Sequence, residues 1–276
     1  MNRPQPPMRM AIAQQAMYWT TAENAACIVA SLAVAAEQGA CVCVFPELAL
    51  TGFHRGLREQ ADPAIVAQAL RQVQAACRTH QIACALGAPT FVDDGAILNS
   101  YLLVNDQGDI IAETAKDGLT PAEATFFARG TTRSVVQFAG RACATVICRE
   151  VEDLEPIAAK LADDTVDLVF WPGLVSPVEG ADDPLAYGVE VCALARRLDA
   201  YIVQSNWPQA LNKPEATQLG LSRVVGADGI MVLQLPADQA GIGVFNLGER
   251  AYHWTPLPAS HRTGHVRHSW TATPSC

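Results

Sequence analysis

Three residues of this 276-residue chain carry side chains that could act together in nucleophilic catalysis. Glu47, Lys116 and Cys148 each stand at or just beyond the end of a predicted buried strand. In open α/β proteins, side chains at the carboxyl ends of strands leave the core and face a crevice. A thiol needs a nearby base or positive charge to act as a nucleophile. Two arrangements are open: a cysteine–histidine pair, for which no nearby histidine gives support, or a carboxylate base with a lysine that stabilises developing charge.

Each of these residues also has an ordinary structural interpretation. Most free cysteines are small core residues, which applies to Cys148. Glu47 suits the first turn of a helix, where acidic side chains are favoured. Lys116 is typical of a solvated charge in a turn. Glu123 follows Thr120 by three residues, which is the spacing of a capping box.

The cysteine count indicates free thiols in a reducing, cytoplasmic setting. Nine cysteines cannot all pair, they include no C-x-x-C motif, and no histidine cluster accompanies Cys41 and Cys43 as zinc ligation would require. We therefore expect no metal. Its position at the end of a buried strand makes Cys148 a nucleophile candidate.

Composition excludes several classes of partner. The 19 Lys and Arg against 28 Asp and Glu leave a net charge of −9, so we expect no binding to nucleic acid. We expect no membrane segment, because no apolar run approaches 18 residues and residues 1–19 lack the apolar region of a secretory leader.

The elements that must position these side chains mix strand–helix crossovers with hairpins. Apolar runs predict strands over 8–14, 41–45, 82–89, 97–104, 110–114, 134–138, 141–147, 167–171, 201–205, 219–225, 230–235 and 241–245. Helical spacing predicts helices over 21–37, 59–79 with an interruption near Pro63, 154–161 and 183–198. We expect one layered α/β domain over 1–276. Its last stretch, 252–276, shows no regular pattern, and we expect it to pack at a surface or subunit interface.

Four motifs together resemble, in order and spacing, the nitrilase superfamily of carbon–nitrogen hydrolases. They are FPELALTGF at 45–53, K-x-x-L-T-P-x-E-x-x-F-F-x-x-G at 116–130, VICRE at 146–150 and ARRLDAYIVQSN at 195–206. The similarity runs from Ala11 to Gln234. Each motif alone is weak, but four in the right order are specific. Together with the position of Cys148 at the end of a strand, they separate this cysteine from eight packing or surface thiols.

This resemblance implies a four-layer α-β-β-α sandwich with mixed sheets and a catalytic triad of Glu47, Lys116 and Cys148. It implies that the cysteine forms a thioester with a small amide substrate, that ammonia or an amine is released, and that no cofactor takes part. Glu123 matches the second glutamate of the family and would orient the lysine. The backbone N–H of Arg149 would hold the oxyanion together with Lys116. A homodimer or higher homo-oligomer is also expected.

Some positions depart from the family pattern. Thr114 and Gly118 stand where members often carry an aromatic residue and a histidine, and Arg149-Glu150 replaces an aromatic-acid pair. Arg149 could lower the pKa of the thiol, bind a substrate carboxylate, or form a salt bridge with Glu150 or Glu152. The alternatives are a nitrilase, a hydrolase of N-carbamoyl amino acids or amines, and a non-catalytic binding protein on the same fold.

Overall fold

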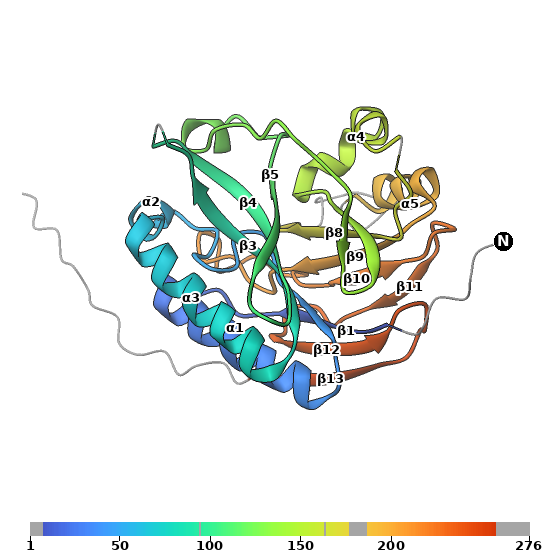
Figure 1. The fold of residues 1–276 in the computed structure, drawn as a ribbon, viewed down its shortest axis with the longest axis horizontal. Helices are drawn as coiled ribbons and strands as arrows, with labels where there is room; N and C mark the ends of the chain where they lie inside the picture. The colour runs from blue at the N-terminus through green and yellow to red at the C-terminus, as the bar shows by residue number, and fades with distance from the viewer. Residues whose placement is uncertain (1–7, 94, 163, 177–186, 258–276) are drawn as a thin grey trace, which may run out of the picture.

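Two β-sheets packed face to face form the centre of the molecule, and helices cover both outer faces (Figure 1). The computed structural model describes residues 8–93, 95–162, 164–176 and 187–257. The expected four-layer sandwich with mixed sheets is confirmed. Strands β1 to β3 run parallel, as do β7 to β9, while the remaining strand pairs are antiparallel.

The seven-stranded sheet has the order β13-β12-β1-β2-β3-β4-β5. Its strands are β1 (Arg9–Gln14), β2 (Val42–Val44), β3 (Ala83–Phe91), β4 (Ile97–Val104), β5 (Ile110–Ala115), β12 (Gly241–Asn246) and β13 (Tyr252–Pro256). The six-stranded sheet has the order β11-β10-β9-β8-β7-β6. Its strands are β6 (Val136–Phe138), β7 (Arg141–Thr145), β8 (Leu168–Gly173), β9 (Tyr201–Asn206), β10 (Arg223–Val225) and β11 (Met231–Gln234).

Alternation along the strands divides the core into three apolar layers. In β1, Met10 and Ile12 face the second sheet, whereas Ala11 and Ala13 face the helices on the other side. Helices α1 (Thr21–Glu37) and α3 (Pro63–His80) cover the seven-stranded sheet. Helices α4 (Leu154–Lys160) and α5 (Gly188–Leu198) cover the six-stranded one.

Local sequence signals explain the helix boundaries. The side chain of Thr20 accepts a hydrogen bond from the Glu23 N–H and caps α1. The interruption predicted near Pro63 is confirmed, because short α2 (Leu57–Gln60) ends before it and Asp62 caps α3 with Pro63 in its first turn. Of the helix predicted over 183–198, residues 183–186 lie outside the described part of the chain, and α5 begins at Gly188.

Two sequence predictions need correction. The stretch 252–276 was expected to lack regular structure, but Tyr252–Pro256 forms β13 and pairs antiparallel with β12. Residues 258–276 lie outside the described part of the chain. The strand predicted over 219–225 is confined to Arg223–Val225, because Gly220 and Leu221 adopt left-handed backbone conformations that a strand cannot contain.

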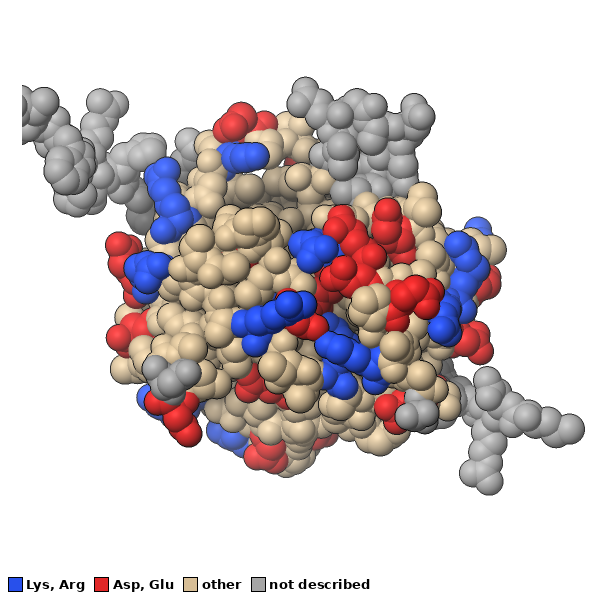
Figure 2. Space-filling view, turned by 90° about the horizontal axis from the view of Figure 1, so that it is seen from above, with Lys and Arg blue, Asp and Glu red and all other residues tan. Residues whose placement is uncertain are grey.

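The outer surface carries charges of both signs. Figure 2 shows Lys and Arg side chains lying among Asp and Glu on the face seen from above. None of the helices in the described ranges has the length and apolar character that a membrane crossing requires.

Gly87 on β3 supports the segment that follows β2, and this gives a test of the fold. A Cβ at Gly87 would lie 2.8 Å from the Glu47 carbonyl carbon and closer still to backbone atoms of Pro46 and Leu48. We predict that Gly87→Ala destabilises the protein by about 1–3 kcal/mol, because the backbone must shift to relieve overpacking. Thermal unfolding measures this.

Gly56→Ala is the matched control, since its Cβ would lie 3.2 Å from ring atoms of His54 and 3.8 Å from Glu59 Oε2, all of them side-chain atoms. A Gly87→Ala variant that unfolds at the same temperature as the Gly56→Ala variant would contradict this account of the segment.

Candidate active site

Glu47 lies in a tight turn after β2 that is held by backbone contacts. Leu48 adopts a left-handed conformation with φ of 52°. Its carbonyl accepts a hydrogen bond from the Gly52 N–H at 2.8 Å, and the Trp207 indole donates to the Glu47 carbonyl at 2.9 Å. The Glu47 side chain is buried as a result of this turn.

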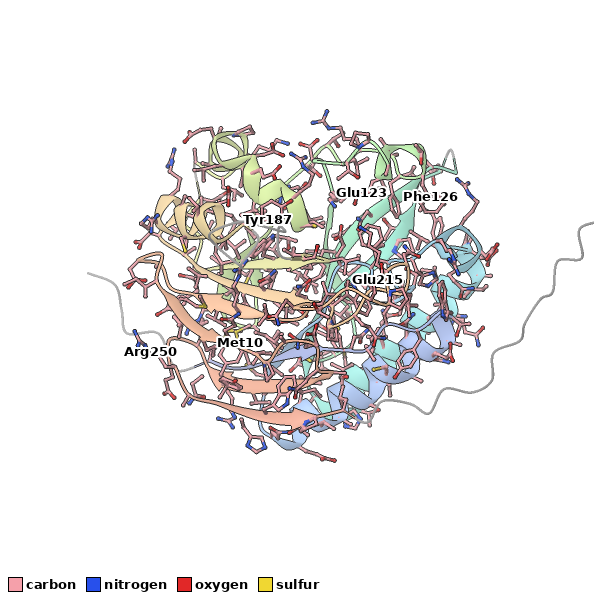
Figure 3. All side chains as sticks on the ribbon, turned by 180° about the vertical axis from the view of Figure 1, so that it is seen from behind. Met10, Glu123, Phe126, Tyr187, Glu215 and Arg250 are labelled. Atoms are coloured by element: carbon pink, nitrogen blue, oxygen red, sulfur yellow. The ribbon has the colours of Figure 1, made fainter. Side chains whose placement is uncertain are left out.

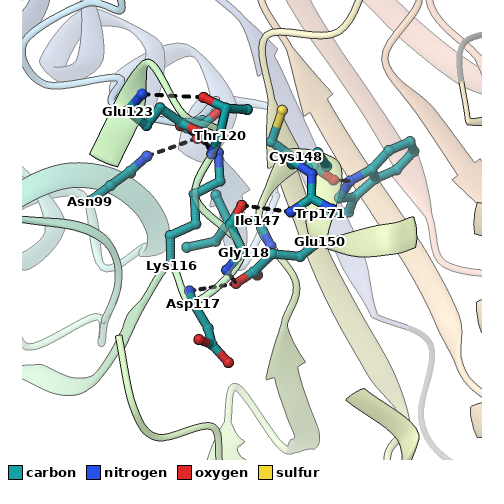
Figure 4. Close-up of polar contacts among 12 residues, drawn as sticks. Asn99, Lys116, Asp117, Gly118, Thr120, Glu123, Ile147, Cys148, Glu150 and Trp171 are labelled. Carbon is teal, nitrogen blue, oxygen red and sulfur yellow. Dashed lines mark hydrogen bonds and ion pairs between the residues drawn. The ribbon is translucent and has the colours of Figure 1, made fainter. Parts of the chain in front are cut away.

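Lys116 follows β5 directly and is buried between two carboxylates (Figure 4). Its Nζ lies 2.7 Å from Glu47 Oε1 and 2.6 Å from Glu123 Oε1. The Lys116 backbone N–H donates to the Asn99 carbonyl at 2.8 Å, which fixes the start of the side chain. The lysine is therefore not a solvated turn residue.

Glu123 uses its two carboxylate oxygens for different purposes. It lies in the short 3₁₀ helix η1 (Glu123–Thr125), where its Oε2 accepts from the Thr120 N–H at 2.8 Å. The Glu123 N–H donates to Thr120 Oγ1 at 3.2 Å, which completes a reciprocal capping box. Oε1 is left to bind Lys116, so the capping interaction predicted from the Thr120–Glu123 spacing is present together with an ion pair to the lysine.

Asn99 on β4 is a site residue that the sequence did not indicate. Its Nδ2 donates to Glu47 Oε1 at 2.8 Å, the same oxygen that binds Lys116. Glu47 Oε2 has no hydrogen-bond partner among the described residues. Only the polar type of Asn99 within an apolar strand could have drawn attention to it.

Cys148 begins the 3₁₀ helix η2 (Cys148–Glu152), three residues after β7 ends. Its φ of 52° is unusual for a residue with a side chain and indicates strain of the kind found at functional sites. The Trp171 indole donates to the Cys148 carbonyl at 2.8 Å (Figure 4). The thiol interacts electrostatically with Glu47 and Lys116, so the structure brings the predicted residues together.

The electrostatics of the site favour a neutral thiol beside a charged lysine. Burial raises the pKa of Cys148 far above its ordinary value; Glu47 raises it further and Lys116 opposes the rise. Burial also raises the pKa of Glu47, against the opposing effect of Lys116. Burial alone lowers the pKa of Lys116, but Glu47, Cys148 and Glu123 outweigh it and bring the pKa above its ordinary value.

Asn206 at the end of β9 supports the segment beside the thiol. Its Nδ2 donates to the Val175 carbonyl at 2.7 Å and its Oδ1 accepts from the Val175 N–H at 2.8 Å. The neighbouring Leu174 backbone forms a hydrogen bond with Cys148 that lowers the pKa of the thiol, an effect smaller than that of burial. Asn206 is the last residue of the ARRLDAYIVQSN motif, but its supporting role was not predicted.

Tyr187 extends the site from the other half of the chain. Figure 3 shows Tyr187 and Glu123 at the same end of the two sheets. Burial, followed by the electrostatic effect of Cys148, raises the pKa of the Tyr187 hydroxyl to about 12.

Arg149 pairs with the second of the two glutamates considered from sequence. Its guanidinium lies 3.1 Å from Glu152 Oε2 and 3.5 Å from Asp153 Oδ1, and it donates to the Gly118 carbonyl at 3.1 Å. Glu150 forms its salt bridge with Arg133 instead, at 2.8 Å.

The remaining thiols and acids form no metal centre within the described ranges. Eight cysteines lie in these ranges and all are free. No group of three or more His, Cys, Asp or Glu that could hold a metal ion comes together there.

The sequence matches a known family over most of its length. The profile of the carbon–nitrogen hydrolases matches residues 9–254. The chain therefore belongs to the carbon–nitrogen hydrolase family, and the resemblance seen in the sequence is confirmed. Among curated proteins, none matches this chain.

Solved structures with the same fold include amidases of the nitrilase superfamily. An amidase from Nesterenkonia sp. AN1, in a double mutant bound to acrylamide, has a TM-score of 0.75 and 23% identity over 90% of this chain and 93% of that chain. A second structure of that amidase, with its cysteine replaced by serine, has a TM-score of 0.75 and 24% identity over 87% of this chain and 91% of that chain.

The bond from Asn99 to Glu47 predicts a measurable shift. A hydrogen bond that favours the ionised form of a carboxylate lowers its pKa. The Asn99 amide lowers the pKa of Glu47 in this way, so Asn99→Leu should raise this pKa. Isotope-edited infrared titration of the carboxyl, with Glu47→Gln subtracted, measures this shift.

Ser100→Ala is the control, because Ser100 is the next residue on β4 but donates to Glu113, at 2.7 Å. An unchanged Glu47 titration in Asn99→Leu would show that the amide does not stabilise the carboxylate.

Proposed function

We propose that this protein hydrolyses the carbon–nitrogen bond of a small amide through a thioester on Cys148, releasing ammonia or an amine. The observation that carries this proposal is that the two oxygens of the Glu47 carboxylate have different surroundings. Both donors, from Asn99 and Lys116, bind Oε1, while Oε2 has no partner in the described part of the chain. Oε2 is thus the free acceptor for the proton of a thiol that burial keeps neutral.

In the first half of the reaction, Glu47 acts as a general base. It takes the thiol proton as Cys148 Sγ bonds to the carbonyl carbon, and the carbonyl π electrons move onto oxygen. Lys116 and the Arg149 N–H stabilise the oxyanion. When the intermediate collapses, the carbon–nitrogen bond breaks and the departing nitrogen takes the proton from Glu47, which leaves a thioester.

In the second half, water replaces the nitrogen. Glu47 takes a proton from a water molecule as that water attacks the thioester carbon. Collapse of the second oxyanion breaks the carbon–sulfur bond, and the proton returns to the Cys148 sulfur. The carboxylic acid leaves, and the enzyme regains its starting protonation.

The fixed peptide after Cys148 supports the oxyanion role of Arg149. In a trans peptide, the N–H of one residue points away from the carbonyl of the residue before it. The Trp171 indole binds the Cys148 carbonyl, so the Arg149 N–H is directed to the opposite side. We propose that Glu123 holds Lys116 in place and orients the substrate nitrogen.

Structural relatives support an amide substrate. The amidase from Nesterenkonia sp. AN1 has been seen with acrylamide bound. A variant of it with glutamate replaced by glutamine carries acrylamide added to its active-site cysteine, and another structure carries the acetamide moiety of fluoroacetamide there.

The alternatives have less support in the site. A substrate with a carboxylate, such as an N-carbamoyl amino acid, would need a free cation, but Arg149 already binds Glu152 and the Gly118 carbonyl. A nitrilase would use the same thiol, and no contact in the site favours a nitrile. A non-catalytic protein would have no need of a buried lysine between two carboxylates.

Three wider expectations stay predictions. The family match over 9–254 supports a single hydrolase domain over 1–276. The free cysteines of the described ranges support a reducing, cytoplasmic setting. A homodimer or higher homo-oligomer is expected from the family.

The variant Glu47→Gln tests the role of the carboxylate. Loss of a general base should lower kcat/KM for amide hydrolysis by about 10²- to 10⁴-fold. Cys148 itself remains, so fluoroacetamide should still alkylate it, more slowly. Ammonia release and peptide mass spectrometry measure these two outcomes.

Glu37→Gln, at the exposed end of α1, makes the same chemical change away from the site and should hydrolyse amides at the wild-type rate. Wild-type turnover in Glu47→Gln would rule out Glu47 as the base.

A further inference from the structure

Glu150 is a buried carboxylate two residues after the nucleophile that the proposed reaction does not use. Its Oε1 accepts hydrogen bonds from the Asp117 N–H at 2.7 Å and the Gly118 N–H at 3.1 Å. Its Oε2 accepts from the Ile147 N–H at 2.7 Å and binds Arg133 Nη2 at 2.8 Å. A carboxylate offers about four lone-pair sites, so this group is saturated.

These contacts connect the two sheets beside the reacting groups (Figure 4). Asp117 and Gly118 follow Lys116 at the end of β5, in the seven-stranded sheet. Ile147 precedes Cys148 beyond the end of β7, in the six-stranded sheet. One carboxylate therefore fixes the backbone next to the lysine relative to the backbone next to the thiol.

Arg133 compensates the buried negative charge of Glu150 and holds the carboxylate in place. Its side chain is 3% exposed, and besides Glu150 it donates to the Thr145 carbonyl at the end of β7. A buried carboxylate without a partner costs several kcal/mol, so the ion pair and three N–H donors are needed together.

Gly118 leaves the space that Glu150 occupies. A Cβ at position 118 would lie 2.9 Å from Glu150 Cγ and 3.0 Å from Arg149 Nη1. A larger side chain at position 118 would collide with Glu150 as it is placed in this chain.

We propose that Glu150 is a positioning residue that sets the separation of Lys116 and Cys148 by holding the backbone beside each. It touches neither the substrate nor the reacting atoms. The inference rests on the proposed function for its effect on turnover, but its effect on thiol reactivity can be measured without turnover.

The variant Glu150→Gln tests the proposal. The amide nitrogen of the glutamine cannot accept a hydrogen bond, so the variant would lose either the bonds from the Asp117 and Gly118 N–H groups or the bond from the Ile147 N–H and the ion pair with Arg133. Misplacement of catalytic groups by about 1 Å lowers rates on the order of 10²-fold. We expect kcat for a small amide to fall about 10- to 100-fold with KM changed less than about threefold.

The rate at which iodoacetamide alkylates Cys148 distinguishes a positioning role from a purely structural one, because loss of stability alone would leave this rate unchanged in the folded protein. As Lys116 withdraws from the thiol, the labelling rate should fall about fivefold or more and its pH dependence should move to higher pH. The exposed Cys41 provides an internal reference in the same peptide map. Glu155→Gln, an exposed residue of α4, is the matched control and should behave as wild type.

Gly118→Ala provides a second route, because it displaces the same loop without removing the buried charge. It should change Cys148 labelling in the same direction, which keeps the test valid where Glu150→Gln does not fold.

The proposal is overturned if the unfolding temperature falls while kcat per folded protein and the labelling profile match Glu155→Gln. If wild type hydrolyses no amide but the labelling shifts appear, the proposed function fails and the positioning role stands.

Discussion

The site depends on one buried cation held between two carboxylates. Lys116 Nζ lies within 2.7 Å of both Glu47 and Glu123, and all three side chains are buried. Breaking a buried pair by removing one partner typically costs about 3–5 kcal/mol. The turn after β2, the end of β5 and the helix η1 must therefore come together before the ammonium can leave water. The same ammonium interacts electrostatically with the Cys148 thiol and, in the proposed reaction, stabilises the oxyanion.

The residues around this ion cluster fix the orientation of the Glu47 carboxylate and of the backbone at Cys148. Asn99 and Lys116 occupy one oxygen of Glu47, Trp171 binds the carbonyl of Cys148, and Asn206 holds Val175 in the segment beside the thiol. Left-handed backbone conformations at Leu48 and Cys148 are the local strain that this arrangement maintains. The two sheets each supply some of these residues. A contact between the sheets, such as that made by Glu150, can therefore set the separation of Lys116 and Cys148 in the proposed reaction.

Apolar runs in the sequence predicted a layered α/β domain. The four-layer sandwich and the grouping of Glu47, Lys116 and Glu123 followed from the family resemblance of four ordered motifs, and the structure places these three side chains in contact. The sequence was insufficient for Asn99 and for the Arg133–Glu150 pair, whose partners are distant in the chain and have no fixed spacing. β13 was missed although Tyr252 and Trp254 alternate with the polar His253 and Thr255, because five residues that end in a proline are a weak strand signal and pairing with β12 decides their conformation. For Arg149 the sequence left three roles open: lowering the pKa of the thiol, binding a substrate carboxylate, or a salt bridge with Glu150 or Glu152. The structure shows the salt bridge, with Glu152.

Direct observation of the acyl-enzyme would test the central claim. Turnover of a small amide such as propionamide is stopped in acid within milliseconds, and the peptides are mapped by mass spectrometry. We predict that the peptide containing Cys148 gains the mass of the acyl group and loses it on treatment with hydroxylamine. An acyl group on another residue, or ammonia release that persists in Cys148→Ala, would contradict the account.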